Sequence, residues 1–231
     1  MIDFHSHILP ALDDGSKNIE ESLALLNMLS QQGVDTVVAT PHFSPDKESV
    51  DDFLLRRRES FESLSSSLSE EHPKIIMGAE VLYYDGISSL QGLEKLCIGD
   101  TNLLLLEMPM CKWSAYAYEE LKTLSYIKGF TVILAHIERY MRYQPQSQWA
   151  KLKDLGILNQ VNASFFIRPL TRRKALSMLL SGNIHAIGSD CHGVETRPPL
   201  MDTAFEYIKS KTGRTFLKDF TEYNKELLFE N

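Results

Sequence analysis

Short runs of apolar residues recur along the chain, and each is followed by a loop and then by a stretch with helical periodicity. Several runs, such as Leu103–Leu106 and Val132–Leu134, are continuously apolar, which is typical of parallel strands buried on both faces. The alternation of strand and helix predicts an α/β fold with a central parallel sheet. The predicted strands are Ile2–Phe4, Thr36–Thr40, Lys74–Ala79, Asn102–Leu106, Thr131–Ala135, Leu158–Asn162 and Ala186–Gly188.

The helical stretches between these strands carry recognisable signals. Asn18 begins a capping-box pattern with Glu21, leucines then recur at helical spacing, and Gly33 ends the helix. No linker, repeat or low-complexity tract interrupts the chain, so residues 1–231 are expected to form one domain. Seven strands predict a distorted, TIM-like (β/α)7 barrel with one unit fewer than the usual eight. Further helices are predicted at Asp51–Leu68, Tyr116–Ile127, Arg172–Leu180 and Asp202–Lys209.

Composition narrows the class of protein. The 231 residues fit the roughly 200–250 that one α/β barrel occupies, and 43% hydrophobic with 24% charged residues is ordinary globular usage. Lys plus Arg is 24 and Asp plus Glu is 31, and the resulting charge of 24 − 31 = −7 argues against a nucleic-acid or anionic-membrane binder. The first residues lack the features of a signal peptide, and no apolar run approaches the roughly 18 residues of a membrane span. We therefore expect a cytoplasmic protein without membrane insertion.

Residues that can bind a metal follow nearly every predicted strand. The carboxyl ends of parallel strands in an α/β barrel share one face, which carries the active site. We therefore expect one cluster at the barrel mouth, to which the loop after the first strand adds Asp13 or Asp14. The other candidates are His5, His7, His42, Glu80, Glu107, His136, Asp190 and His192.

About nine nitrogen and oxygen donors are too many for one ion, because a tetrahedral site takes about four ligands. The set therefore predicts two or three divalent cations bridged by carboxylates. Ligands of this kind suit manganese, iron or zinc, and we favour Mn2+. His72 and His185, by contrast, are expected to be ordinary structural histidines.

Two arginines, Arg139 and Arg197, are placed to reach the same mouth, where a guanidinium can bind phosphate through two hydrogen bonds. Arg56–Arg58 lie within a helical pattern and are expected to form a solvated face. Cys191 and Arg197 also satisfy Cys-x5-Arg, the short signature of cysteine-dependent phosphatases. The match is weak, since Glu195 would place a negative charge against the phosphate. All three cysteines, Cys97, Cys111 and Cys191, are expected to be free thiols because their spacing is unpaired.

The candidate ligands lie in six short blocks of sequence: His5–Ser16, Ala39–His42, Gly78–Glu80, Leu106–Glu107, Ala135–Arg139 and Ser189–His192. In these blocks the sequence resembles the polymerase-and-histidinol-phosphatase (PHP) superfamily, and within it the bacterial capsule-associated tyrosine phosphatases of the CpsB/CapC/YwqE type. The resemblance covers residues 1 to about 200. It departs at Ala11, where glycine is frequent, and in the segment Met108–Trp113.

The resemblance implies a seven-stranded PHP barrel with three metal ions, usually manganese. It also implies dephosphorylation of tyrosines on a bacterial tyrosine kinase that regulates polysaccharide export. By motif, His5, His7, Glu80 and Asp190 would hold one ion, Glu80, Glu107 and His136 a second, and His42, His192 and Asp14 a third. Arg139 and Arg197 match the phosphate-binding arginines.

The expected chemistry is hydrolysis of phosphotyrosine by a metal-bridging hydroxide, without a side-chain nucleophile. His42 or the third ion would assist departure of the phenolate, whose conjugate acid has a pKa near ~10. Three alternatives remain open at this point: a PHP phosphoesterase acting on a small molecule such as histidinol phosphate, an amidohydrolase, and a non-catalytic metal-stabilised binding module.

Overall fold

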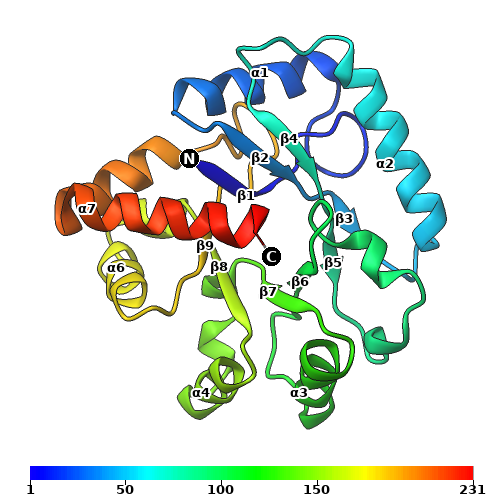
Figure 1. The fold of residues 1–231 in the computed structure, drawn as a ribbon, viewed down its shortest axis with the longest axis vertical. Helices are drawn as coiled ribbons and strands as arrows, with labels where there is room; N and C mark the ends of the chain where they lie inside the picture. The colour runs from blue at the N-terminus through cyan, green and yellow to red at the C-terminus, as the bar shows by residue number, and fades with distance from the viewer. Residues whose placement is uncertain (231) are drawn as a thin grey trace.

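Parallel strands form the centre of the molecule in the computed structural model, which describes residues 1–230 (Figure 1). Every strand pair is parallel, and the strands form two hydrogen-bonded ladders. The first ladder has the order β1 (Ile2–Ser6), β2 (Thr36–Ala39), β4 (Lys74–Met77). The second has the order β3 (His42–Phe43), β5 (Glu80–Leu82), β6 (Leu103–Glu107), β7 (Thr131–Leu134), β8 (Leu158–Asn162), β9 (Ala186–Gly188).

Two of the seven predicted strands are interrupted. The segment predicted at Thr36–Thr40 ends as β2 and resumes after Pro41 as β3, and Lys74–Ala79 ends as β4 and resumes as β5. The two interrupted segments stay side by side, because the Glu80 amide donates to the Pro41 carbonyl at 3.0 Å. The sequence analysis missed β3 and β5, since elements of two or three residues are too short to show a period.

The parallel sheet curls, and helices surround it (Figure 1). Backbone hydrogen bonds link the segments that follow its first and last strands: the Asp190 amide donates to the His5 carbonyl at 2.7 Å, and the His7 amide to the Cys191 carbonyl at 3.0 Å. The predicted α/β class with a parallel sheet is confirmed. The strand ends that carry the candidate site residues are thereby brought towards one another.

All five predicted helices are present, with some shifts at their ends. The side chain of Asn18 caps the first helix by accepting from the Glu21 amide at 2.9 Å, and a π-helical turn at Thr123–Ile127 extends the third. The helix at Gln146–Asp154 was not predicted. The helices are α1 (Ile19–Gln31), α2 (Val50–Ser65), α3 (Ala115–Lys122), α4 (Gln146–Asp154), α5 (Ser164–Ile167), α6 (Arg172–Leu180) and α7 (Met201–Phe229), with short 3-10 turns at Ile87–Ser89, Leu93–Leu96, Ile137–Arg139 and Met141–Tyr143.

Alternation along the strands produces two apolar layers. Val37, Leu104 and Val132 belong to the larger layer, which includes residues of the surrounding helices. Their strand neighbours belong to a smaller cluster within the curled sheet, and this cluster also contains Leu227 and Leu228 from the end of α7. Its buried members are Ile2, Phe4, Val38, Ile98, Leu103, Leu105, Ile133, Ala135, Ala186, Leu227 and Leu228.

The last helix is longer than the predicted Asp202–Lys209 because α7 contains a break. Gly213 has φ 86° and ψ 173°, a conformation that glycine adopts without steric cost. The break separates a first half, which contributes Met201, Ala204 and Ile208 to the outer layer, from a second half that reaches the inner cluster. The chain end therefore helps to close the inside of the curled sheet.

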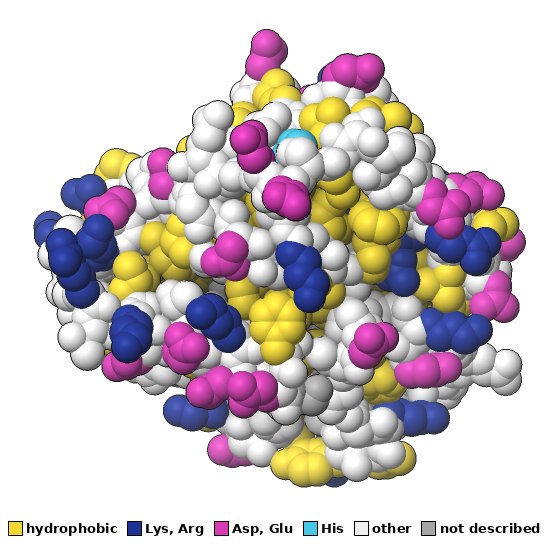
Figure 2. All heavy atoms as spheres, turned by 45° about the horizontal axis from the view of Figure 1, so that its top comes forward, with side chains coloured by type: hydrophobic (Ala, Val, Ile, Leu, Met, Phe, Trp, Pro, Cys, Tyr) yellow, Lys and Arg dark blue, Asp and Glu magenta, His cyan; other side chains and the backbone are white. Residues whose placement is uncertain are grey.

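None of the helices in residues 1–230 combines the length and apolar character needed to cross a membrane. On the face shown in Figure 2, basic and acidic side chains are interspersed with hydrophobic ones. This mixture contrasts with the single-sign surface that binds nucleic acid through its phosphates.

Candidate metal centre

Most candidate metal ligands lie at or just beyond the carboxyl end of a strand, and Asp14 lies in the loop after β1. His5 is in β1 and His7 follows it, whereas Glu107 ends β6. His42 and Glu80 come just after β2 and β4 and begin β3 and β5, where they are direct partners in the parallel register. The two strand interruptions are what place these residues opposite each other. His136, Asp190 and His192 come from the segments after β7 and β9.

Glu80 lies at the centre of the cluster. Its Oε2 atom is 3.2 Å from His5 Nε2, 3.3 Å from His7 Nε2 and 3.0 Å from His42 Nδ1. Its Oε1 atom is 2.7 Å from His136 Nε2. The side chain is 1% exposed, so this carboxylate is fully inside the protein. One carboxylate therefore joins four imidazoles from three different strand ends.

Asp190 connects the imidazoles to the two arginines. Its Oδ1 atom lies 3.6 Å from His7 Nε2 and 3.8 Å from His5 Nε2. Its Oδ2 atom accepts hydrogen bonds from Arg139, from Arg197 at 2.6 Å and from Asn162 Nδ2 at 2.6 Å. Both arginines predicted to reach the mouth therefore do so, and they contact a candidate ligand directly.

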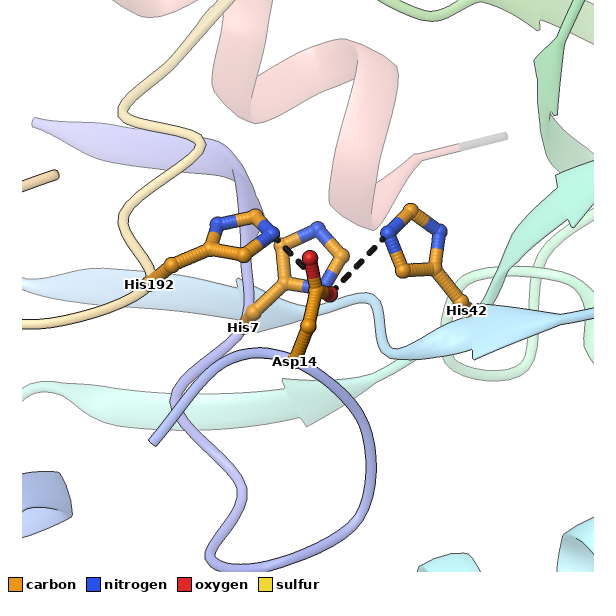
Figure 3. A group of neighbouring side chains, drawn as sticks. All are labelled: His7, Asp14, His42 and His192. Carbon is orange, nitrogen blue, oxygen red and sulfur yellow. Dashed lines mark ion pairs between the residues drawn. The ribbon is translucent and has the colours of Figure 1, made fainter. Parts of the chain in front are cut away.

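Asp13 and Asp14 have different places in the cluster. Asp14 is 67% exposed, and its Oδ1 atom lies between two imidazoles, 3.4 Å from His42 Nε2 and 3.3 Å from His192 Nε2 (Figure 3). Asp13 lies behind His7 instead, and its Oδ2 atom accepts from His7 Nδ1 at 2.7 Å and from the His42 amide at 2.9 Å. Asp14 thus faces the site, while Asp13 orients one of its histidines.

Glu107 completes the cluster at its edge. It lies 3.5 Å from His136 Nε2 and is 16% exposed. Burial and the nearby charge of Glu80 raise the pKa of its carboxyl. The structure thus brings together all nine predicted ligands, and four subsets of them have donor atoms within 4.8 Å of one another. These subsets are His7, Asp14, His42 and His192; His5, His7 and Asp190; His5, Glu80 and His136; and His42, Glu80 and Glu107.

Several donor atoms of the cluster have no suitable hydrogen-bond partner among the neighbouring side chains, whereas a divalent cation would satisfy them. Within residues 1–230, Glu80 Oε2 and His192 Nε2 are buried without a hydrogen-bond partner. Buried polar atoms are normally satisfied, so such orphans call for an ion or another partner. Nε2 of His5 and Nε2 of His7 also face each other at 3.1 Å. Imidazole and carboxylate donors at this density suit Zn2+, Fe2+ or Mn2+.

Opposing charges shift the pKa values within the cluster. Burial would lower the pKa of His7, but the hydrogen bond with Asp13 and the charges of Asp13 and Glu80 raise it to about 10. Burial would raise the pKa of Glu80, but the charge of His5 and the hydrogen bond between Glu80 Oε1 and His136 hold it well below its usual range. Burial and the charges of His7 and Arg197 lower the pKa of His192 to about 4. A cation that binds here must replace protons on His7 and His5. The affinity for the cation should therefore decrease as the pH is lowered.

Two residues of the site have a left-handed backbone conformation. His136 has φ 32° and Asp190 φ 53°, a region that non-glycine residues adopt at a cost of roughly 1–3 kcal/mol. Hydrogen bonds hold both turns, since the His136 amide donates to Gln160 Oε1 at 2.6 Å and the Asp190 amide to the His5 carbonyl. Ala11 is also left-handed, with φ 53°. Glycine adopts this conformation more readily than alanine does.

The sequence analysis missed the supporting polar residues. Gln160 is fully buried, and its Oε1 atom also lies 3.3 Å from His5 Nδ1. Asn162 holds Asp190 and accepts from Gln160 Nε2 at 3.2 Å. Asp3 is buried in β1 and accepts from the His5 and Ser189 amides. A signal existed, because the buried strand Leu158–Asn162 contains amide side chains where apolar ones are expected.

The prediction that Arg56–Arg58 form a solvated face is wrong for two of the three residues. Arg56 pairs with Glu48 at 2.7 Å, and Arg57 Nη1 donates to the Gly78 carbonyl at 2.5 Å, close to the interruption of β4 and β5. Burial lowers the pKa of Arg57 to about 10. Only Arg58 behaves as the predicted solvated side chain, because the other two reach across to neighbouring segments.

The remaining predictions concern cysteines and two histidines. Cys97, Cys111 and Cys191 are free, as expected. Cys191 is fully buried, and burial raises the pKa of its thiol, which makes it a poor nucleophile. Nδ1 of His72 accepts from the Ser69 amide and Nδ1 of His185 from the Asn159 amide, which confirms structural roles for both.

Comparison with known proteins gives consistent matches over the whole chain. Residues 1–230 match the family described as "Capsular polysaccharide synthesis, CpsB/CapC". The tyrosine-protein phosphatase CpsB of Streptococcus pneumoniae is 30% identical, covering 100% of this chain and 99% of its own. YwqE of Bacillus subtilis, also described as a tyrosine-protein phosphatase, is 31% identical, covering 100% and 92%. A crystal structure described as YwqE and CpsB, "unique metal-dependent tyrosine phosphatases", superposes with a TM-score of 0.85 at 25% identity, covering 99% of this chain and 94% of the other.

Proposed function

The chain belongs to the CpsB/CapC family of capsular polysaccharide synthesis, and from this membership and the metal centre we propose that it is a metal-dependent protein-tyrosine phosphatase. It hydrolyses the phosphate monoester of tyrosine side chains in proteins. The resemblance to PHP enzymes that act on small molecules extends only to the ligand set, whereas the matched relatives act on protein tyrosine.

The observation that carries this proposal is the position of Glu80 Oε2, within 3.3 Å of three imidazole nitrogens and without a hydrogen bond. Such an arrangement has no benefit for stability in itself, because a buried carboxylate and several imidazoles must all leave water. It fits a carboxylate that bridges cations. The adjoining pair of arginines supplies the groups that recognise phosphate.

We assign the ligands as follows. His5, His7, Glu80 and Asp190 hold one ion, which agrees with contacts of 3.1–3.8 Å among their donor atoms. Glu80, Glu107 and His136 hold a second, and His42, His192 and Asp14 a third. The set supports three ions, and we propose manganese over iron and zinc because carboxylates contribute strongly to it.

When bound, the divalent ions lower the pKa of water and neutralise negative charge on phosphoryl oxygens. Arg139 and Arg197 orient the phosphate: each uses one amino group on Asp190, and the remaining N–H groups can bind the equatorial oxygens. Both side chains are about one third exposed, so substrate can reach them. His42 is the most exposed imidazole of the cluster, at 38%, and we assign to it stabilisation of the departing phenolate.

The proposal also covers the substrate protein, the cellular location and the strand count of the barrel. The substrate is a phosphotyrosine protein, and we propose a membrane-associated bacterial tyrosine kinase that controls polysaccharide synthesis. Free thiols at all three cysteines are consistent with a cytoplasmic location. If each interrupted pair, β2 with β3 and β4 with β5, counts as one strand, the curled sheet is a distorted seven-stranded barrel.

The test uses metal-depleted full-length protein reloaded with manganese, iron or zinc. It is assayed on a phosphotyrosine peptide, a phosphoserine peptide and histidinol phosphate. We expect metal-dependent release of phosphate from the phosphotyrosine peptide, with the highest rate in manganese. Preferential hydrolysis of histidinol phosphate would reassign the substrate, and no hydrolysis of any of the three would leave a metal-stabilised binding module.

A further inference from the structure

A groove of about 340 Å3 adjoins the two phosphate-binding arginines and contains a third arginine that the proposed mechanism does not use. Asp190, Arg139 and Arg197 line this groove together with Arg168 from the turn between α5 and α6. Arg139 and Arg197 are paired with Asp190, but the guanidinium of Arg168 has neither a hydrogen bond nor an ion pair with any other residue of the part that the structure describes.

The backbone that carries Arg168 is held firmly. The Arg168 carbonyl accepts from the amides of Thr171 and Arg172, each at 3.0 Å, and the Arg168 amide donates to the Ser164 carbonyl at 3.2 Å. A side chain on a fixed turn loses less conformational freedom on binding than one on a mobile loop. Arg168 is therefore presented to the groove by a pre-organised segment, although its own charge remains unpaired.

The other polar groups of the groove favour an anion. The hydroxyls of Ser164 and Thr196 line it and have no partner within residues 1–230. Two carboxyl groups also line it, but Asp190 is paired, and Glu138 accepts from the Asn162 amide through Oε1 and keeps Oε2 buried. The accessible unpaired charge on the groove wall is thus that of Arg168.

We propose that this groove is a substrate subsite that binds the carboxylate of an aspartate or glutamate close in sequence to the phosphotyrosine. The inference rests on the proposed phosphatase function and specifies its substrate as an acidic segment. A guanidinium matches a carboxylate through paired N–H donors, and the two free hydroxyls can donate to the same group. The chain as a whole carries a charge of −7, so it repels acidic segments elsewhere, and the groove gives them one favourable position.

The experiment measures kcat/KM of the manganese-loaded full chain on phosphotyrosine peptides with a single Asp or Asn at each position from three before to three after the phosphotyrosine. Because the groove is partly open to water, we expect a preference of about 3- to 10-fold for Asp at the best position. Arg168→Gln should abolish this preference. The change should appear in KM, since a contact remote from the reacting phosphorus is made equally in the ground and transition states.

A matched control is Arg173→Gln, which removes the same charge from an exposed position on α6 that does not line the groove. This variant should keep the preference of the parent. Equal rates on Asp and Asn peptides at every position would overturn the inference while leaving the phosphatase function intact. An equal loss on phenyl phosphate, which carries no carboxylate, in Arg168→Gln would also overturn it, because Arg168 would then bind the phosphate itself. No hydrolysis of any peptide by the parent would instead refute the proposed function, and the inference with it.

Discussion

Replacing Asp13 with asparagine tests whether this residue positions His7 without binding a cation. Asp13 receives three hydrogen bonds, from His7 Nδ1 at 2.7 Å and the His42 amide at 2.9 Å on one oxygen, and from the Gly15 amide at 2.9 Å on the other. An asparagine in the same place can accept on one side only. Its amino group would then face the Gly15 amide, donor against donor.

The magnitude follows from the bond that is weakened. A charge-assisted hydrogen bond from an imidazole contributes about 1.5–3 kcal/mol, and loss of the partner that orients a metal-binding histidine costs roughly 10- to 100-fold in affinity. We therefore expect Asp13→Asn to bind manganese about 30-fold more weakly, which corresponds to about 2 kcal/mol. Excess manganese should restore the original number of bound ions, because the ligands themselves remain.

The assay is a manganese titration with elemental analysis of the bound ions, run beside Asp14→Ala. Asp14 is exposed and faces His42 and His192, so its loss should remove one bound ion and leave the affinity of the others nearly unchanged. Affinity within about 3-fold of the parent in Asp13→Asn would refute the positioning role. If Asp13→Asn loses an ion and Asp14→Ala does not, the two roles are exchanged.

Three further outcomes are expected. Alanine at Arg139 or Arg197 should leave the metal content unchanged but lower kcat/KM on phosphotyrosine about 10- to 150-fold, and lysine should restore part of the loss. Turnover like that of the parent in both alanine variants would contradict phosphate binding by these residues. Cys191→Ser should retain most turnover and alkylating reagents should inhibit poorly, whereas His136→Ala should be severely impaired; a phosphocysteine trapped during turnover would reverse this assignment. A chelator should remove the ions and abolish activity, and mild acid should do the same because protons compete at His5 and His7, whose pKa values are raised. The absence of tightly bound transition metal from protein that was never exposed to chelator would refute the multinuclear centre.

The sequence allows prediction of those features that depend on local pattern or on a general property of parallel sheets. The consecutive leucines of β6 indicate a strand buried on both faces, and Asn18 with Glu21 marks the start of α1. The convergence of His5, Glu80 and the other strand-end residues follows because parallel strands end on one face. No knowledge of distances is needed for that step.

Features that depend on contacts between distant segments could not be predicted in the same way. Gln160 supports His5 across 155 positions, and only the folded structure shows that its amide replaces an apolar side chain for this purpose. The different places of Asp13 and Asp14 depend on the path of one loop. The interruption at Pro41 is visible in the sequence, but its effect, the pairing of His42 with Glu80, requires the register of two neighbouring strands.

The end of α7 joins the inside of the curled sheet through contacts of very long range in the sequence. Leu227 and Leu228 belong to the same buried cluster as Ile2 and Phe4, more than 220 positions away. Contacts of such long range form slowly, because the entropy of closing a long loop opposes them. Asp190 likewise reaches His5 and His7 across more than 180 positions. The inner cluster and the metal centre are therefore expected to form late in folding, so metal loading is expected to follow closure of the sheet.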